Sequence, residues 1–224
     1  MEQTLSGVGV LDKSVRVLDA VAESVGPCAL GDLVEATGLP KATAHRLAGA
    51  LEVHGLLRRD RDGRYLLGVR LIGLGRAAAE DWPLAEAARP ALEELRTVTG
   101  ESVQLYRRDG QHRVCVVSLE SPHELRTIVP QGSRLPLGLG SAGRILAGED
   151  EGRPWTASVG ERAPGVSSVS APVTIDGRLL AAVGISGPVG RLGDHPGDRY
   201  GEAVAAAAGA IAAAAAPSEP EAGV

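Results

Sequence analysis

The first seventy residues carry the pattern of short amphipathic helices. Apolar side chains recur every three or four positions, which is the spacing of one helix face. Three helices are predicted, over residues 11–22, 30–36 and 41–54. Gly38 is suited to end the second helix, and Pro40 is suited to the first position of the third. The link between these two helices is therefore a tight turn that contains glycine.

The third helix is followed by a predicted β-hairpin. Residues 56–59 and 64–67 flank Asp62-Gly63, a dipeptide that favours the turn of a hairpin. Within helix 41–54 a buried stripe is expected at Ala44, Leu47, Ala48 and Leu51. Three helices with a tight turn between the second and the third, followed by a hairpin, have the order of a winged helix-turn-helix.

After Gly68 the pattern changes to a mixture of helices and strands. Helices are predicted from residue 69, over 83–99 and over 203–216, and strands over 102–107, 113–119, 125–129, 166–173 and 179–186. Asp176-Gly177 marks a hairpin between the last two strands. Strands with flanking helices predict an α+β domain behind the helix-turn-helix.

The predicted organisation is therefore two domains between two tails. The segments are a flexible tail over 1–7, a winged helix-turn-helix domain over 8–70, an α+β domain over 71–216 and a disordered tail over 217–224. A helix over about 69–80 is expected to link the two domains and to couple them.

Composition narrows the class of protein. Apolar residues make up 44% of the 224 residues, whereas aromatic residues are 2% and Phe is absent, so that aliphatic side chains must form the core. No apolar run approaches the length of a membrane span, and residues 1–9 lack the basic flank and apolar stretch of a signal peptide. Cys28 and Cys115 lie far apart and are expected to be reduced thiols. A cytoplasmic protein without membrane contact is predicted.

The charge is unevenly distributed along the chain, whose net charge is −5. Residues 1–37 hold two basic and six acidic residues, whereas residues 38–70 hold seven basic and three acidic residues. A local basic segment in an acidic protein is expected of a face that contacts DNA, although a solvated surface has the same appearance on charge alone.

The third helix and the hairpin supply the candidate DNA-binding residues. An arginine can read a guanine with two hydrogen bonds, and a small side chain can contact a thymine methyl group. Lysine, threonine and the helix N-terminus suit phosphate groups. The candidates are Lys41, Ala42, Thr43, His45 and Arg46 on the helix, and Arg59, Arg61 and Arg64 on the hairpin.

Several separated blocks of the sequence resemble the IclR family of bacterial transcriptional regulators. Residues 38–47, Leu51, 55–56 and 65–68 are similar to the DNA-binding domain of that family. Blocks 99–103, 129–136, 165–173 and 185–188 follow in the order of the family, so that the resemblance covers about residues 7–215. The stretches 6–13 and 104–108 resemble actinobacterial members tied to amino-acid metabolism.

The resemblance implies a GAF-like effector-binding domain with a ligand pocket against its sheet. Carried over by motif, the pocket residues are Gly140, Ser141, Ala142, Ser168 and Ser186. Serine hydroxyls and the free N–H groups of a helix start suit a small anion. Because few aromatic residues are present to stack on a flat ligand, a small carboxylate or an amino acid is the expected effector.

Two departures from the family pattern affect this pocket. Gly184 stands where many members carry a hydroxyl group, and the segment near 148–155 is shorter than in the family by about one helix and one loop. The shortening leaves a second interpretation open, in which the C-terminal domain is degenerate and serves only oligomerisation.

An enzyme is the other class of protein considered. Residues 138–143 match neither a nucleophile elbow nor a P-loop. The five histidines and two cysteines show no metal-ligand spacing. No catalytic residue, metal site or cofactor is predicted.

The predicted function is that of a sequence-specific transcriptional regulator. Its expected partners are double-stranded DNA with a near-palindromic operator, a small-molecule effector and further copies of the same chain. The family resemblance implies homodimers that pair into homotetramers. The operator, the effector and the sign of regulation stay open.

Overall fold

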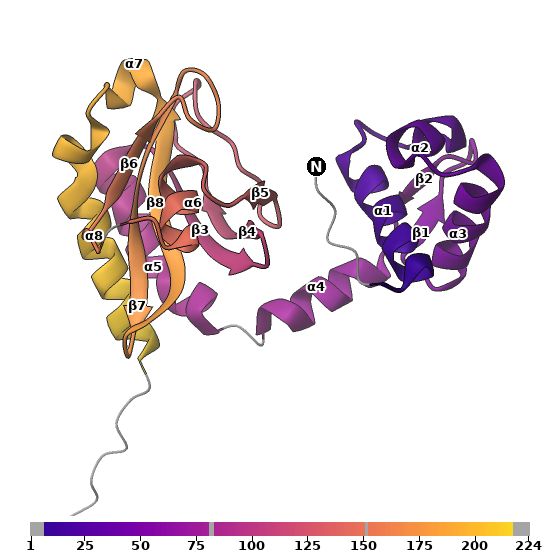
Figure 1. Cartoon of the computed structure of the whole chain (residues 1–224), viewed down its shortest axis with the longest axis horizontal. Helices are drawn as coiled ribbons and strands as arrows, with labels where there is room; N and C mark the ends of the chain where they lie inside the picture. Colours follow the sequence, from indigo (N-terminus) through magenta and orange to yellow (C-terminus); the bar gives the residue numbers. More distant parts are fainter. Residues whose placement is uncertain (1–6, 81–82, 151, 217–224) are drawn as a thin grey trace, which may run out of the picture. The chain divides into compact units, whose positions relative to one another are not determined.

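The computed structural model describes residues 7–80, 83–150 and 152–216, and it divides into two compact units (Figure 1). The units are Met1–Asp81 and Trp82–Val224, whereas the sequence predicted a boundary after residue 70. The difference is the helix α4 (Arg70–Glu80), which is grouped with the first unit. The predicted tails lie outside the described residues, apart from Gly7.

The first unit consists of helices and a short hairpin, as predicted. Its elements before α4 are α1 (Gly9–Glu23), α2 (Leu30–Thr37), α3 (Lys41–Val53), β1 (Leu57–Arg59) and β2 (Tyr65–Leu67). The predicted stripe of α3 is confirmed, because Ala44, Leu47, Ala48 and Leu51 are all buried. They share one core with residues of α1, α2 and the hairpin, including Val17, Leu33 and Tyr65.

The turn between α2 and α3 is fixed by local hydrogen bonds. Gly38 has φ 64°, a left-handed conformation that glycine adopts without a Cβ penalty, and its N–H donates to the Val34 carbonyl at 2.9 Å. The Leu39 N–H donates to the Thr37 hydroxyl at 3.3 Å. The chain therefore leaves α2 in a defined direction, and α3 begins directly after Pro40.

Gly68 marks the place where the chain leaves the hairpin and passes close to its own backbone. Its N–H donates to the Leu56 carbonyl at 2.8 Å, and a Cβ at this position would overlap with the Gly55 carbonyl oxygen. We expect Gly68→Ala to lower the free energy of unfolding of the first unit by about 1–3 kcal/mol, because backbone must move to admit the methyl group. Amide hydrogen exchange of α1 to α3 measures this loss.

Gly49 provides the matched control for that substitution. It lies in the interior of α3 with open space around the position of a Cβ. Gly49→Ala is expected to stabilise the same unit by roughly 0.5–1 kcal/mol, since alanine favours the helix. Equal effects of the two substitutions would contradict the close approach at Gly68.

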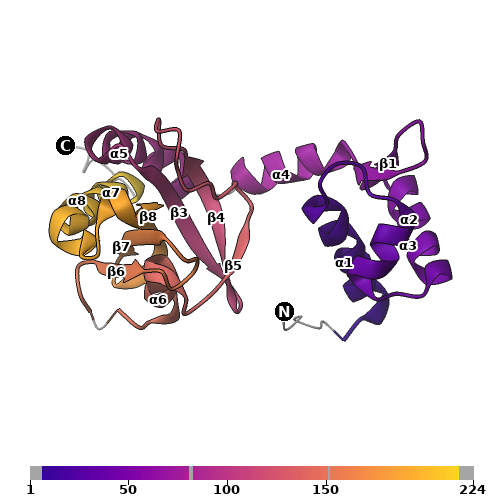
Figure 2. The same ribbon diagram turned by 90° about the horizontal axis from the view of Figure 1, so that it is seen from above.

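The second unit is an antiparallel sheet covered by helices on both faces (Figure 2). The strands lie in the order β5-β4-β3-β8-β7-β6. Their bounds are β3 (Ser102–Asp109), β4 (His112–Leu119), β5 (Arg134–Pro136), β6 (Thr156–Val159), β7 (Val166–Ile175) and β8 (Arg178–Pro188). The helices are α5 (Pro83–Thr99), α6 (Gly140–Ala147), α7 (Val189–Leu192) and α8 (Pro196–Ala215).

The two faces of this sheet have different cores. On one face α5 and α8 pack with Leu92, Val183 and Ile211 in a large aliphatic cluster. On the other face α6 packs with Ile145 against Tyr106 of β3 and Ala182 of β8. The second face has one short helix over it, which leaves room for the polar residues described below.

Some predicted elements of the second unit need correction. Residues 125–129 were predicted as a strand but belong to a loop, and α8 begins at Pro196 instead of residue 203. Leu125 and Ile128 are exposed in the loop, and Pro130 has no N–H for a ladder. The short elements β5, β6 and α7 were not predicted. The hairpin at Asp176-Gly177 is confirmed, with both residues at positive φ.

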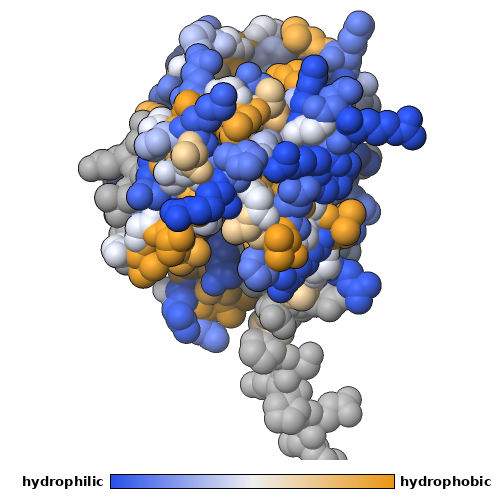
Figure 3. Space-filling model, turned by 90° about the vertical axis from the view of Figure 1, so that its right-hand side faces the viewer, coloured by the Kyte–Doolittle hydropathy of each residue, from blue (hydrophilic) through white to orange (hydrophobic). Residues whose placement is uncertain are grey.

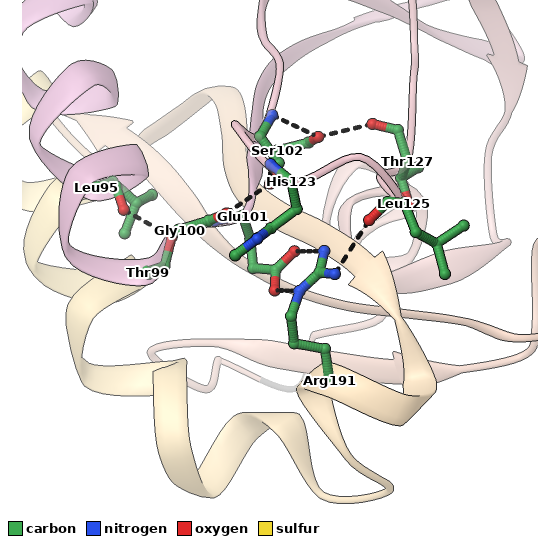
Figure 4. Close-up of polar contacts among 10 residues, drawn as sticks. Leu95, Thr99, Gly100, Glu101, Ser102, His123, Leu125, Thr127 and Arg191 are labelled. Carbon is green, nitrogen blue, oxygen red and sulfur yellow. Dashed lines mark hydrogen bonds and ion pairs between the residues drawn. The ribbon is translucent and has the colours of Figure 1, made fainter.

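A buried ion pair holds α7 and this loop to the start of β3 (Figure 4). Glu101 is only 1% exposed, and both of its carboxylate oxygens accept from Arg191, with distances of 2.5 and 2.7 Å. Arg191 also donates to the Leu125 carbonyl at 3.0 Å, and the Ser102 hydroxyl donates to the Thr127 carbonyl at 2.7 Å. Side chains thus replace the backbone ladder that a strand would have formed.

The segment 148–155, which the family resemblance predicted to be short, connects α6 to β6 and contains no helix or strand among its described residues. Its described residues form turns and bends, with Gly148 in a left-handed conformation at the end of α6. The indole of Trp155 lies on α8 where Gly197 and Gly201 leave space, since a Cβ at either glycine would overlap with the ring. The tryptophan therefore anchors this connection to the core of the unit.

Candidate functional site

The N-terminal end of α3 presents polar side chains away from the buried stripe. Lys41, Ala42, His45 and Arg46 are exposed, and Thr43 is half-buried. Figure 3 views the side of the molecule on which α3 lies in Figure 1, and hydrophilic side chains are interspersed there with several hydrophobic groups. Among the described residues, neither Lys41 nor Arg46 has a hydrogen-bond or ion-pair partner. Their charged groups are therefore available to an external ligand.

The three candidate arginines of the hairpin are not equivalent. Arg61 and Arg64 are exposed beside the turn, where the Asp60 carboxylate accepts the N–H groups of Asp62 and Arg64 at 2.9 and 2.8 Å. Arg59 instead pairs with Glu52 of α3 at 3.0 Å, and its guanidinium lies 4.7 Å from the ring centroid of Tyr65. Arg59 therefore holds the hairpin against α3. The side chains of Arg61 and Arg64 make no comparable contact with the described residues of the domain.

A polar cavity lies between the N-terminus of α6 and the sheet. It encloses about 20 Å³ that a water-sized molecule can occupy, within a hollow of about 400 Å³ that includes open solvent. All five predicted pocket residues line it, namely Gly140, Ser141, Ala142, Ser168 and Ser186. Gly184, which the sequence analysis noted as a departure from the family pattern, also lines it. Further lining residues that were not predicted are Gln104, Tyr106, Arg113, Ser158, Arg162, Val166, Ser170 and Ile185. The structure thus brings together every predicted pocket residue in one place.

Strand register assembles the floor of the cavity from rows of facing residues. Ser158 of β6, Ser168 of β7 and Ser186 of β8 pair across neighbouring strands. In the next row Ser170 of β7 pairs with Gly184 of β8, which pairs with Gln104 of β3. Paired residues point to the same face of a sheet, so that these polar groups meet beneath α6.

The serine hydroxyls of the cavity form hydrogen bonds with one another and with Gln104. The Ser141 hydroxyl lies 2.8 Å from each of the Ser168 and Ser170 hydroxyls, and Ser158 lies 3.1 Å from Ser168. The Ser186 hydroxyl donates to Gln104 Oε1 at 3.0 Å. A ligand that enters must replace these bonds with its own polar atoms. The network therefore favours a small ligand that is rich in oxygen.

Gly184 is explained by its neighbour across the strands. A Cβ at this position would overlap with the Ser170 hydroxyl, and the backbone oxygen of Val169 lies close to the same place. The glycine therefore makes room for the Ser170 side chain. The family resemblance implied one fewer polar contact here, and Ser170 supplies a hydroxyl group in the same row of the sheet.

The N–H group at the N-terminus of α6 already has an acceptor within the protein. The Gly140 N–H donates to the Glu161 carboxylate at 3.0 Å, and the other carboxylate oxygen of Glu161 pairs with Arg144 at 3.4 Å. An anionic group at this place complements the partial positive charge of the helix end. Glu161 is thus held at the rim by two contacts, and it is not among the residues that line the cavity.

Cys115 of β4 is a buried thiol on the same face of the sheet as the cavity. Burial raises its pKa to about 12, which keeps it protonated near neutral pH. Burial also raises the pKa of Cys28 in the first unit. We therefore expect neither thiol to react with iodoacetamide at pH 8 in the folded protein, and both to react in guanidinium. Mass spectrometry distinguishes these states, and rapid alkylation of native Cys115 would contradict the packing around α6.

Two family models match the chain, one on each unit. The IclR helix-turn-helix domain matches residues 10–61, and the bacterial transcriptional regulator IclR C-terminal domain matches residues 76–153. The chain therefore belongs to the IclR family of bacterial transcriptional regulators. The predicted combination of an N-terminal helix-turn-helix with an α+β C-terminal domain is confirmed.

Individual relatives agree with this placement. The HTH-type transcriptional regulator KipR of Bacillus subtilis (strain 168) is 36% identical over 117 residues, which are 52% of this chain and 47% of KipR. The chain spans about half the length of the curated relatives that it matches. These relatives are regulators of transcription, in agreement with the prediction that the chain is not an enzyme.

Solved structures of the family share the fold. An IclR-family transcriptional regulator from Rhodococcus sp. is 29% identical with a TM-score of 0.58, and the match covers 97% of each chain. An IclR homologue from Microbacterium hydrocarbonoxydans, crystallised with 4-hydroxybenzoate, is 20% identical with a TM-score of 0.75. That match covers 92% of this chain and 98% of the homologue. None of the described helices is long and apolar enough to cross a membrane.

Proposed function

We propose that this protein is a cytoplasmic transcriptional regulator that reads a specific DNA sequence with α3. The observation that carries the proposal is the polar N-terminal end of α3, whose opposite face is buried in the core of the first unit. A recognition helix needs both faces, because one must hold the helix to its domain while the other enters the major groove. The family membership supports the same function.

The candidate residues take different roles in this proposal. Arg46 reads a base edge, and Ala42 lies near a thymine methyl group. Lys41, Thr43 and the helix N-terminus bind phosphate groups. His45 is exposed beside Arg46 and contacts the same groove. Arg61 and Arg64 of the hairpin contact the DNA backbone or the minor groove, while Arg59 positions the hairpin.

The protein is proposed to act as a homodimer or homotetramer on a near-palindromic operator. Large apolar side chains are exposed on α1 and at the start of α4, among them Val10, Leu11 and Ile72, the last at 75% exposure. A monomer in water rarely leaves so many large apolar side chains uncovered. A second copy that covers them would set two α3 helices at a fixed spacing.

The C-terminal cavity is proposed to bind a small metabolite that modulates operator binding. The sequence favours a small carboxylate or an amino acid, and the hydroxyl-rich floor supports a ligand with several oxygen atoms. The structural neighbour that contains 4-hydroxybenzoate supports effector binding in this fold. The effector would favour one arrangement of the domains through its differential affinity, with α4 as the connecting element.

A selection from genomic DNA followed by gel shifts tests the regulator function. Enriched fragments are expected to give a saturable shift that resists random competitor DNA at several salt concentrations, because base contacts persist when phosphate contacts are screened. A candidate fragment is the promoter beside the protein's own gene. If no fragment is enriched and every shift is abolished by random DNA, sequence-specific regulation is wrong.

A second candidate function is a regulator whose C-terminal domain only oligomerises. The serine hydroxyls already bond to one another, and the described part of segment 148–155 contains no helix or strand that could cover the cavity. Both features favour this function. Thermal shift and calorimetry with a broad panel of carboxylates and amino acids discriminate between the two functions, since a ligand that binds the native state raises its stability. A panel without heat or shift would favour the oligomerisation role.

A further inference from the structure

The cavity contains a buried cation that has no carboxylate partner. Arg113 of β4 is 3% exposed, and Gly143 of α6 leaves the space for its guanidinium, because a Cβ there would overlap with it. One of its terminal nitrogens donates to the Pro136 and Leu139 carbonyls at 2.5 and 2.7 Å, whereas Nε has no partner among the described residues. Within the described parts of the chain, no Asp or Glu pairs with it.

A buried guanidinium without a counter-charge is costly for a protein. Removal from water penalises the charged form, and a neutral carbonyl compensates less than a carboxylate does. Burial accordingly lowers the pKa of Arg113; Tyr106, whose ring centroid lies 5.3 Å from the guanidinium carbon, raises it, and Arg162 lowers it. The uncompensated charge is explained if an anion from outside completes the site.

The rest of the lining is also suited to an anion. Arg162 is a second guanidinium on the cavity wall, and none of the lining residues is acidic. The acid nearest along the chain, Glu161, is held by Gly140 and Arg144. Two positive charges line the cavity, and the carboxylate at its rim, Glu161, is shared with Arg144, so that the local potential favours an anion.

A free neutral donor lies on the cavity floor, on the strand next to that of Arg113. Gln104 is 2% exposed, its Oε1 accepts from Ser186, and its Nε2 has no partner among the described residues. A buried amide N–H without an acceptor is rare in proteins, because it forfeits a hydrogen bond. An oxygen atom of a ligand would satisfy it.

We propose that the cavity recognises a small hydroxy- or oxo-carboxylate without an ammonium group, with Arg113 as the anchor of its carboxylate. This inference rests on the effector-binding part of the proposed function and narrows the expected ligand class. A guanidinium binds a carboxylate with charge-assisted hydrogen bonds. Arg162 adds the second charge, and Gln104 donates to the hydroxyl or oxo group. An amino acid is disfavoured, since its ammonium group would meet two cations while the nearby Glu161 carboxylate is already bonded to Gly140 and Arg144.

Calorimetry on the full chain with matched triads tests the ligand class. The three compounds of a triad share one carbon skeleton of two to six carbons. They are the hydroxy acid, the corresponding amino acid and the amide of the hydroxy acid, for example lactate, alanine and lactamide. The oxo acid, pyruvate for this skeleton, is measured beside them. At least one acid is expected to bind, with the matched amino acid and amide weaker by about tenfold or more, because they lose the charge-assisted pair or add repulsion.

Two substitutions test the anchoring role with the acid that binds. Arg113→Gln is expected to weaken binding by about tenfold or more. Because that change also removes donors from two buried carbonyls, Arg162→Gln provides a second variant at a half-buried position, with a smaller loss expected. Arg134→Gln is the matched control, since Arg134 is exposed on β5, pairs with Asp109 at 3.2 Å and does not line the cavity.

The outcomes separate this inference from the function on which it rests. If an amino acid or an amide binds as tightly as its matched acid, or if both variants bind the acid like the wild type, the anchoring role of Arg113 is overturned while effector binding stands. If no member of any triad binds, both the inference and the effector-binding function are overturned.

Discussion

Replacing Arg191 by alanine is expected to lower the free energy of unfolding of the second unit by about 3 kcal/mol, the lower end of the usual effect of breaking a buried ion pair, because the Arg191 side chain itself is 29% exposed. The substitution leaves Glu101 without its two charge-assisted bonds at a position that is 1% exposed. It also frees the Leu125 carbonyl in the adjacent loop. Trp155 packs on α8 in the second unit, so that denaturation in urea followed by tryptophan fluorescence measures this loss.

Arg126→Ala is the matched control for that experiment. Arg126 lies in the same loop and pairs with Glu120 at 2.7 Å, but both side chains are substantially exposed, at 33% and 49%. The expected loss is about 0–1 kcal/mol, because solvent already screens such a pair. Similar losses for Arg126→Ala and Arg191→Ala would contradict the burial of the Glu101 pair.

A double substitution separates the cost of the orphaned charge from the value of the pair. Glu101→Met with Arg191→Leu removes both charges and keeps apolar volume at the junction of α7 and β3. It is expected to recover part of the loss seen for Arg191→Ala, since an apolar pair avoids the desolvation of two ions. A double variant that is less stable than Arg191→Ala would mean that the polar contacts to the loop dominate.

The first unit was predictable from sequence because its determinants are local. The stripe of α3 follows from residue spacing alone, and Gly38 and Asp62-Gly63 fix the turns through backbone preferences. Each of these signals acts within a few residues. Exposed positions such as Arg46 then follow once the buried face is known.

The cavity was only partly predictable because strand register assembles it. Gln104 and Ser170 alternate with buried apolar residues, which is a signal for one face of a strand. Their meeting across Gly184 depends on pairings between strands that are distant in sequence. Arg113 looks like a surface residue at a strand start, and its burial depends on the absence of a side chain at Gly143 of another element.

At residues 125–129 the sequence predicted a strand that the structure does not contain. These residues have the β-propensity of a strand, yet Leu125 and Ile128 stay exposed and the loop is held by Arg191 and Ser102. Propensity in strands reflects packing on a neighbouring surface more than a preference of the backbone. A contact between residues 66 positions apart along the chain could not be inferred from that local pattern.

Arg46→Ala is expected to weaken operator binding by about 1–3 kcal/mol, which is roughly 5–150-fold in the dissociation constant. Arg46 is exposed at the N-terminal end of α3, and no described residue holds its guanidinium. A bidentate contact with a guanine is lost on truncation, whereas random DNA offers no fixed guanine at that position. Fluorescence anisotropy with the selected operator and with random DNA, at several salt concentrations, measures both losses.

Arg59→Ala separates a base contact from the general effect of losing a positive charge near the DNA. Arg59 already pairs with Glu52 and lies over Tyr65, so that its removal is expected to change operator affinity by less than Arg46→Ala does. If Arg46→Ala weakens specific and random DNA equally and reduces the salt dependence by about one phosphate contact, Arg46 binds phosphate only. The reading of the operator would then depend on other exposed residues of α3, with His45 next in line beside Arg46 on the same polar end of the helix.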